Sequence, residues 1–237
     1  MTDASTEIVV HNRVDRVVLG IVRARGIVTG YQDDMFDDSL SDLISERADG
    51  VTGELENVRA ESRNMLRNRT YKPTGRGKPA SEYLLRAASQ PDSFPRVNWP
   101  VDICNFISLK YILPISIWDL DAASAEVFVF RLGLPGEDYV FNTAGQEIGL
   151  CDLVVGCAVR GADYENGIPI VNPIKDSMAT KTSPSTTDVA ASIYAPASLD
   201  ESVVRNACDE FAEWLGRSDD DAVTAVTVVS PGERRSC

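Results

Sequence analysis

The stretch RVNWPVDICNFISLKYILPISIWDLD, residues 96 to 121, separates a mostly helical first part of the chain from a strand-rich second part. Pro100 is typical of the first turn of a helix, where its fixed φ angle fits and its missing N–H costs nothing. Apolar residues then recur at helical spacing along one face: Ile103, Phe106, Ile107 and Tyr111. The stretch therefore predicts a helix that packs one face against a core.

The segments before this stretch predict one strand and three helices. DRVVLGIVR, residues 15–23, is a short apolar run bounded by charges and predicts a buried strand. Helical spacing predicts helices over 33–47, from Glu54 to about Arg69, and around Tyr83, Leu84 and Leu85. YKPTGRGKP, before the third helix, holds two prolines and two glycines and predicts a loop.

The segments after it predict a series of short strands and one long helix. The strand-like runs, separated by turns with glycine or proline, are EVFVFRL, EDYVF, DLVVGCAV, IPIVN and DVAASIY. Ser198 and Glu201 have capping-box spacing before a helix that we expect to stop at Gly216, and TAVTVVS predicts a final strand. Because helices and strands do not alternate regularly, we expect the α+β class, in one compact domain spanning residues 1–237.

Composition narrows the classes of function. With 36 acidic and 23 basic residues the formal net charge is −13, and no apolar run approaches the roughly 20 residues of a membrane span. The N-terminus has no basic stretch followed by an apolar core and a cleavage site, so we expect a cytoplasmic protein without membrane contact.

The single histidine and the scattered cysteines limit the metal sites and catalytic groups that the chain can form. Only His11 is present, before the first expected strand, and the five cysteines form no C-x-x-C pair. We therefore expect no metal site and no cofactor, and any catalysis must proceed without imidazole. No phosphate-binding loop of the G-x-x-x-x-G-K-[ST] type occurs, so no nucleotide cofactor is expected either. The acidic string DDMFD, Asp33 to Asp37, fits solvated acids at a helix start.

Positive charge is concentrated in one region. From Arg59 to Arg86 the chain carries eight basic residues against two glutamates, although the protein as a whole is acidic. A basic stripe on an acidic body is what a phosphate-backbone partner requires. The alternative is that these arginines pair with the protein's own carboxylates.

The order of motifs resembles the editing module of the bacterial phenylalanyl-tRNA synthetase beta subunit. That module contains, in order, the motif V-D-hydrophobic-T-N, an apolar-aromatic helix and the motif G-x-P-hydrophobic-H-A-F-D-L-D. This chain has the same order: VDICN (101–105), the helix to Tyr111 and PISIWDLD (114–121). GIPIVNPIKDS (167–177) and YKPTGRGKPASEYLLR are similar to the stand-alone branch, the "B three/four" domain proteins. The resemblance covers roughly residues 60–195.

The resemblance implies a layered β/β/α architecture and hydrolysis of tRNA that carries the wrong amino acid. An aminoacyl ester is already activated, so a site needs only to fix the ribose, orient a water and stabilise the oxyanion. Carried over by motif, the expected catalytic residues are Asn105, Ser116 and Asp176. The expected substrate-binding residues are Cys104, Asn172, Lys175, Ser177 and Thr180. The expected RNA-binding residues are Arg67, Arg69, Lys72, Arg76 and Lys78.

Two departures from the module fall in the expected pocket. Cys104 replaces its threonine and Ser116 replaces its histidine, so its specificity for tyrosine does not transfer. Three aspartates match those of the module: Asp102, Asp119 and Asp121. We expect them mainly to hold local backbone amides. The leading hypothesis is a deacylase of misacylated tRNA that acts in trans, without an ATP-dependent synthetase core. The alternatives are a non-catalytic RNA-binding module and a pocket for free amino acids or small aminoacyl compounds.

Overall fold

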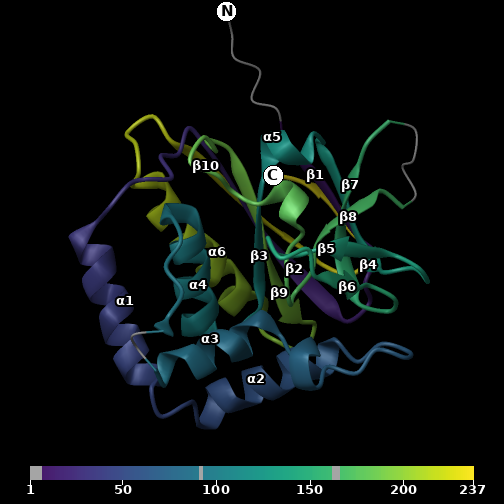
Figure 1. The fold of residues 1–237 in the computed structure, drawn as a ribbon, viewed down its shortest axis with the longest axis horizontal. Helices are drawn as coiled ribbons and strands as arrows, with labels where there is room; N and C mark the ends of the chain where they lie inside the picture. Colours follow the sequence, from purple (N-terminus) through teal and green to yellow (C-terminus); the bar gives the residue numbers. More distant parts are fainter. Residues whose placement is uncertain (1–6, 91–92, 162–165) are drawn as a thin grey trace, which may run out of the picture.

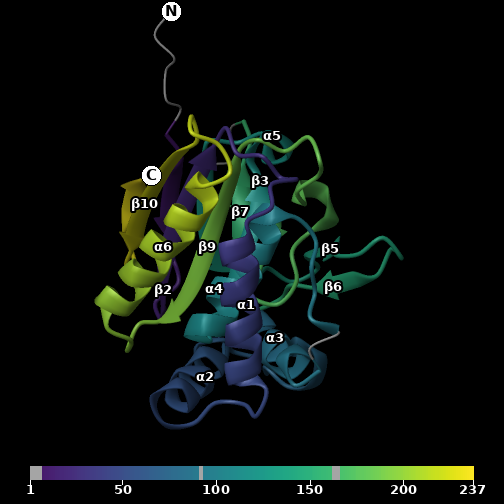
Figure 2. The same ribbon diagram turned by 90° about the vertical axis from the view of Figure 1, so that its left-hand side faces the viewer.

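The computed structural model describes residues 7–90, 93–161 and 166–237, which form three layers (Figure 1). Helices cover one face of a four-stranded sheet, and a five-stranded sheet packs on its other face. This mixture of sheets and helices confirms the expected α+β class. Figure 2 shows the helical layer from the side of α1.

The four-stranded sheet is the middle layer. Its strands run in the order β10, β2, β9 and β3, with bounds Val223–Val229, Val17–Arg25, Val189–Pro196 and Ile115–Asp119. All three pairings in this sheet are antiparallel. Every residue of β9 and of β3 is buried, as expected for strands covered on both faces.

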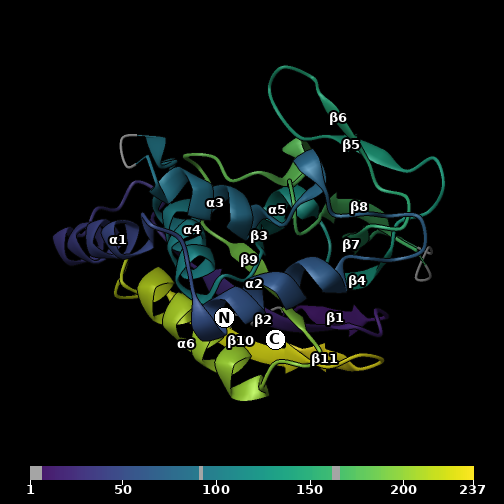
Figure 3. The same cartoon turned by 90° about the horizontal axis from the view of Figure 1, so that it is seen from below.

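The five-stranded sheet is the outer layer. Its strands run in the order β11, β1, β4, β7 and β8, with bounds Arg234–Ser236, Val9–Asn12, Val127–Leu132, Val154–Val159 and Ile168–Val171. A two-stranded ribbon, β5 (Asp138–Val140) with β6 (Glu147–Gly149), stands out from the body near this sheet (Figure 3).

Six α-helices are present in the described residues. Their bounds are α1 Asp34–Arg47, α2 Gly53–Met65, α3 Ala80–Ala88, α4 Trp99–Tyr111, α5 Leu120–Ala123 and α6 Glu201–Gly216. Two 3₁₀ turns, η1 (Gly75–Gly77) and η3 (Met178–Thr180), lie in the connecting segments. Asn98 caps α4 through its side chain, and Pro100 lies in the first turn as expected.

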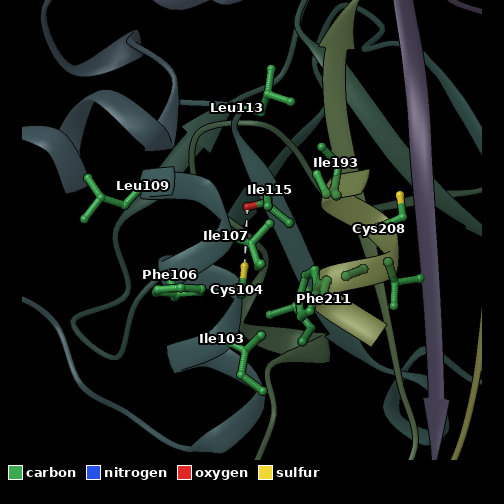
Figure 4. Close-up of a cluster of buried hydrophobic side chains, with 14 of the residues drawn as sticks. Ile103, Cys104, Phe106, Ile107, Leu109, Leu113, Ile115, Ile193, Cys208 and Phe211 are labelled. Carbon is green, nitrogen blue, oxygen red and sulfur yellow. Dashed lines mark hydrogen bonds between the residues drawn. The ribbon is translucent and has the colours of Figure 1, made fainter. Parts of the chain in front are cut away.

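Two apolar cores separate the three layers. Ile103 and Ile107 of α4 pack with Phe211 of α6, Ile115 of β3 and Ile193 of β9 in the core under the helices (Figure 4). The second core lies between the sheets, where Trp118 packs against Phe128 with ring centroids 5.2 Å apart. The central sheet therefore contributes alternate residues to both cores, which is the period-2 pattern of a strand buried on each face.

The expected helices and strands are present, but the buried strand β3 was not predicted, and several boundaries were wrong. His11 was expected before the first strand, but it lies inside β1, a short strand that pairs with β4 and β11. The second helix was expected to reach Arg69, yet it ends at Met65. The expected Ser198 cap of α6 is wrong, because the Asp200 side chain accepts the Ser202 N–H. Gly216 is the last residue of α6 rather than a stop beyond it.

Gly20 in β2 is a position where a side chain has no room. A Cβ atom there would lie 2.5 Å from the Cys208 Sγ and 2.9 Å from a Val204 methyl on α6. We expect Gly20→Ala to lower the free energy of unfolding by about 1–3 kcal/mol through overpacking, as measured by urea unfolding.

The matched control is Gly149→Ala, because a Cβ atom at Gly149 meets nothing within 4 Å. We expect this control to change stability by less than about 0.5 kcal/mol. If steric overlap is the cause, Cys208→Ala should relieve part of the cost of Gly20→Ala in the double mutant. An additive double mutant would contradict this explanation.

Candidate active site

A cavity of about 280 Å³ lies between α4, β3 and the segment that follows β8. Five of the eight residues expected in the pocket line it: Cys104, Asn105, Asn172, Lys175 and Asp176. The volume is close to the lower end of the range for small-ligand sites, so the cavity has room for a group the size of an amino acid. Its walls combine aliphatic side chains with amide, ammonium and carboxyl groups.

The Asp176 carboxyl group is the acid of this wall, and its pKa is strongly raised. Burial raises its pKa from 3.8 to about 7, although the Ser116 hydroxyl, two backbone N–H groups and the charge of Lys181 oppose the change. The N–H groups of Ile117 and Asn172 lie 3.3 and 3.4 Å from its two oxygens. A fixed carboxyl group with a pKa near neutrality can exchange a proton at physiological pH.

The Asn172 side chain shapes the turn that carries Lys175 and Asp176. Its Oδ1 accepts the N–H groups of Ile174 and Lys175, both at 2.8 Å. Its Nδ2 donates to the Tyr139 hydroxyl at 2.5 Å, and that hydroxyl donates to the Lys175 carbonyl at 2.8 Å. With its polar atoms engaged, Asn172 positions the turn instead of binding substrate directly.

Two lysines connect the cavity to the β5–β6 ribbon. The Lys175 Nζ lies 3.8 Å from the centroid of the Phe141 ring, a cation–π contact. The Lys181 Nζ donates to the Phe141 carbonyl at 2.8 Å. Burial lowers the pKa of Lys175, and the charge of Arg76 lowers it further. Tyr139 and Phe141 were not predicted, because only the tertiary fold brings the ribbon to this turn.

Cys104 and Asn105 face the cavity from α4 with different chemistry. The Cys104 Sγ is directed at the Ile115 carbonyl, 4.0 Å away, and burial raises the pKa of the thiol well above its usual range (Figure 4). The thiol therefore stays protonated and is a poor nucleophile. Asn105 is half-buried, and within the described part of the chain its Nδ2 makes a single hydrogen bond, of 3.5 Å, to the Pro95 carbonyl. Its amide is therefore available to a ligand.

Three expected site residues do not line the cavity. Ser116 was expected to be catalytic, but it is fully buried in β3, donates to the Asn172 carbonyl at 2.9 Å and accepts from Tyr194 at 3.1 Å. Ser177 was expected to bind substrate, but its hydroxyl caps η3 by accepting the Ala179 N–H. Thr180, in η3, is only 1% exposed. Ser116 therefore supports the Asn172 part of the wall, whereas Ser177 and Thr180 belong to the turn that follows it.

Asp102 and Asp119 hold local backbone amides, as expected, whereas Asp121 is exposed and no backbone bond of its side chain is found within the described residues. Asp102 accepts the Val97 N–H at 2.7 Å and pairs with Arg96. Asp119 accepts the Ala122 N–H at 2.8 Å at the start of α5.

The basic region divides into an internally paired part and an exposed part. Arg59 and Arg63 on α2 form ion pairs with Glu82 on α3, so the alternative of internal pairing holds for them. The Arg69 Nη1 lies 3.8 Å from the Asp152 Oδ1, within ion-pair distance. Within the described residues, no ion pair to a carboxylate is formed by Arg67, Lys72, Arg76 or Lys78.

The loop from Lys72 to Lys78, called the basic loop below, is fixed beside the cavity. The Tyr71 hydroxyl donates to the Gly77 carbonyl at 2.9 Å, and burial raises the pKa of Tyr71 to about 12. Ala80, directly after the loop, lines the cavity, and its N–H donates to the Pro173 carbonyl at 2.9 Å. The loop therefore leads from the surface to the cavity wall.

Over residues 7–90, 93–161 and 166–237, no three His, Cys, Asp or Glu side chains group closely enough to hold a metal ion. In the same ranges, no helix has both the length and the apolar character to cross a membrane. Comparison with protein-family models and with curated protein sequences found no match to this chain.

Proposed function

We propose that this protein hydrolyses the ester of misacylated tRNA in trans. The observation that carries the proposal is the cavity that brings Asn105, Lys175 and Asp176 together beside an exposed basic loop. The resemblance of residues 96–121 and 167–177 to the synthetase editing module favours the same reaction.

In the proposed reaction, the Asp176 carboxylate takes a proton from a water molecule while that water attacks the ester carbonyl carbon. The carbonyl oxygen becomes an oxyanion, which the Asn105 Nδ2 and the Lys175 ammonium group stabilise. When the C–O ester bond breaks, the ribose oxygen takes the proton back from Asp176. The products are a free amino acid and a tRNA with a free terminal hydroxyl.

The test is the loss of ester from a panel of misacylated tRNAs in the presence of the purified protein. We expect Asn105→Ala to lower the rate about 10²- to 10³-fold, the usual effect of removing one oxyanion donor. The matched control is Asn57→Ala, which removes an exposed asparagine from α2 and should leave the rate unchanged. Tight tRNA binding with no ester loss from any member of the panel would contradict the proposal.

A further inference from the structure

A second cavity, of about 210 Å³, adjoins the first on the side of α3. The two share six residues: Ala80, Cys104, Asn105, Ile115, Ile174 and Lys175. Tyr83 and Leu84 of α3 and Ser108 of α4 complete the second cavity. The hollow that starts at Asp176 therefore continues past Asn105 and Lys175 and ends at Tyr83.

Tyr83 presents an aromatic ring at the outer end of this hollow. The residue is 40% exposed, and its hydroxyl donates to the Gly75 carbonyl in the basic loop at 3.4 Å. Arg76 is close enough to lower the pKa of Tyr83, against the larger opposite effect of burial. An exposed ring next to a cation is the combination on which single-stranded nucleic acids stack a base.

The order of groups along the hollow matches the order of groups in an aminoacyl-tRNA end. One end of the hollow holds the Asp176 carboxyl, whereas the Tyr83 end lies beside the basic loop, because the Tyr83 hydroxyl bonds the Gly75 carbonyl of that loop. Asn105 and Lys175 lie at the junction because they line both cavities. An ester at the junction would place its amino acid in the first cavity and its nucleoside in the second.

We propose that the cavity between Tyr83 and Asn105 seats the terminal nucleoside of the tRNA, with its base stacked on the Tyr83 ring. This inference rests on the proposed function, because it assigns the nucleoside part of that substrate. It also explains why the basic loop lies beside the Tyr83 end of the hollow, since the next phosphates of the strand leave the cavity there. Phosphate contacts position the strand, and stacking accepts any base.

The probe is the trinucleotide CCA in which 2-aminopurine replaces the terminal adenine, because stacking quenches 2-aminopurine fluorescence. We expect the wild type to quench the probe on binding. We expect Tyr83→Ala to weaken binding at least fivefold and to abolish the quenching, because one base–aromatic stack is worth about 1–3 kcal/mol. Tyr83→Phe keeps the ring and should keep the quenching.

The control is Leu134→Ala, which truncates another exposed apolar side chain, 43% exposed and outside both cavities. It should bind and quench like the wild type. Thermal unfolding of each variant shows whether α3 remains folded. Quenching and affinity that survive in Tyr83→Ala, or a wild type that does not bind the probe, would overturn the nucleoside seat.

The probe carries no ester, so this experiment is independent of the deacylation assay. Tyr83-dependent quenching without hydrolysis of any misacylated tRNA would support the seat and contradict the proposed reaction. Hydrolysis with a KM that Tyr83→Ala leaves unchanged would support the reaction and contradict the seat.

Discussion

Replacement of Asp176 by asparagine is expected to reduce ester hydrolysis by about 10²- to 10⁴-fold, the usual contribution of a general base. The carboxyl group is the only proton acceptor that the described cavity wall offers near neutral pH, because Cys104 remains a thiol and Lys175 is a cation in contact with Phe141. An amide of the same size cannot take a proton from water. The measurement is the single-turnover rate of ester loss from the best tRNA of the panel.

The pH profile separates a general base from a residue that only holds the wall. Because the pKa of Asp176 is raised to about 7, the wild-type rate should rise with pH through about 7 and then level off. The Asp176→Asn profile should lack this step. The matched control Asp121→Asn changes an exposed aspartate outside the cavity and should keep both the rate and the step. A step that persists in Asp176→Asn would refute the assignment.

The same raised pKa affects the stability of the fold. Between 3.8 and about 7 the folded protein keeps a proton on Asp176 that the unfolded chain has released. The free energy of unfolding therefore falls as the pH rises across this range, by up to about 4 kcal/mol from this group. Urea unfolding at pH 5 and pH 8 should show a smaller loss for Asp176→Asn than for the wild type.

The sequence predicted the cavity wall where local signals were strong. The capped, apolar-faced helix after Asn98 places Cys104 and Asn105 as expected, and the turn after β8 brings Lys175 and Asp176 to the same cavity. Ser116 was assigned to the pocket by its motif, without regard to the direction of its side chain. Each β3 side chain is buried, and Ser116 lies between Ile115 and Ile117, which face the helical core. Alternation therefore turns Ser116 toward the other sheet.

Contacts distant in sequence could not be predicted in the same way. Tyr139 and Phe141 belong to a ribbon about thirty-five residues before the turn that they contact, as the Tyr139–Lys175 bond shows. The sequence predicted a basic region correctly, but it did not predict which basic residues pair internally and which remain exposed. Arg59 and Arg63 pair with Glu82 only because the tertiary fold brings their side chains on α2 within reach of α3. A strand as short as β1, with four residues, carries too few positions for a periodic pattern.

Reversal of charge in the basic loop, by Lys72→Glu, Arg76→Glu and Lys78→Glu together, is expected to weaken tRNA binding by about 100-fold or more at 50 mM salt. The three side chains form no ion pair to a carboxylate within the described residues, so they are available to phosphates. Each phosphate contact on a single strand contributes about −0.7 to the slope of log affinity against log salt. The slope for the triple variant should therefore be less steep by about 2.

The control must change the net charge equally, because the whole protein is already acidic. Arg205→Glu, Arg234→Glu and Arg235→Glu together do so on α6 and β11, on the side of the molecule away from α3 and the ribbon (Figure 3). This control should keep most of the affinity and the wild-type salt slope, since general repulsion is screened beyond about 10 Å at 0.1 M salt. Equal losses in both triple variants would mean that total charge, rather than the basic loop, governs binding. In that case the basic loop would not bind the phosphates of the tRNA acceptor strand, and the proposed nucleoside site at Tyr83 would lose the support of those contacts.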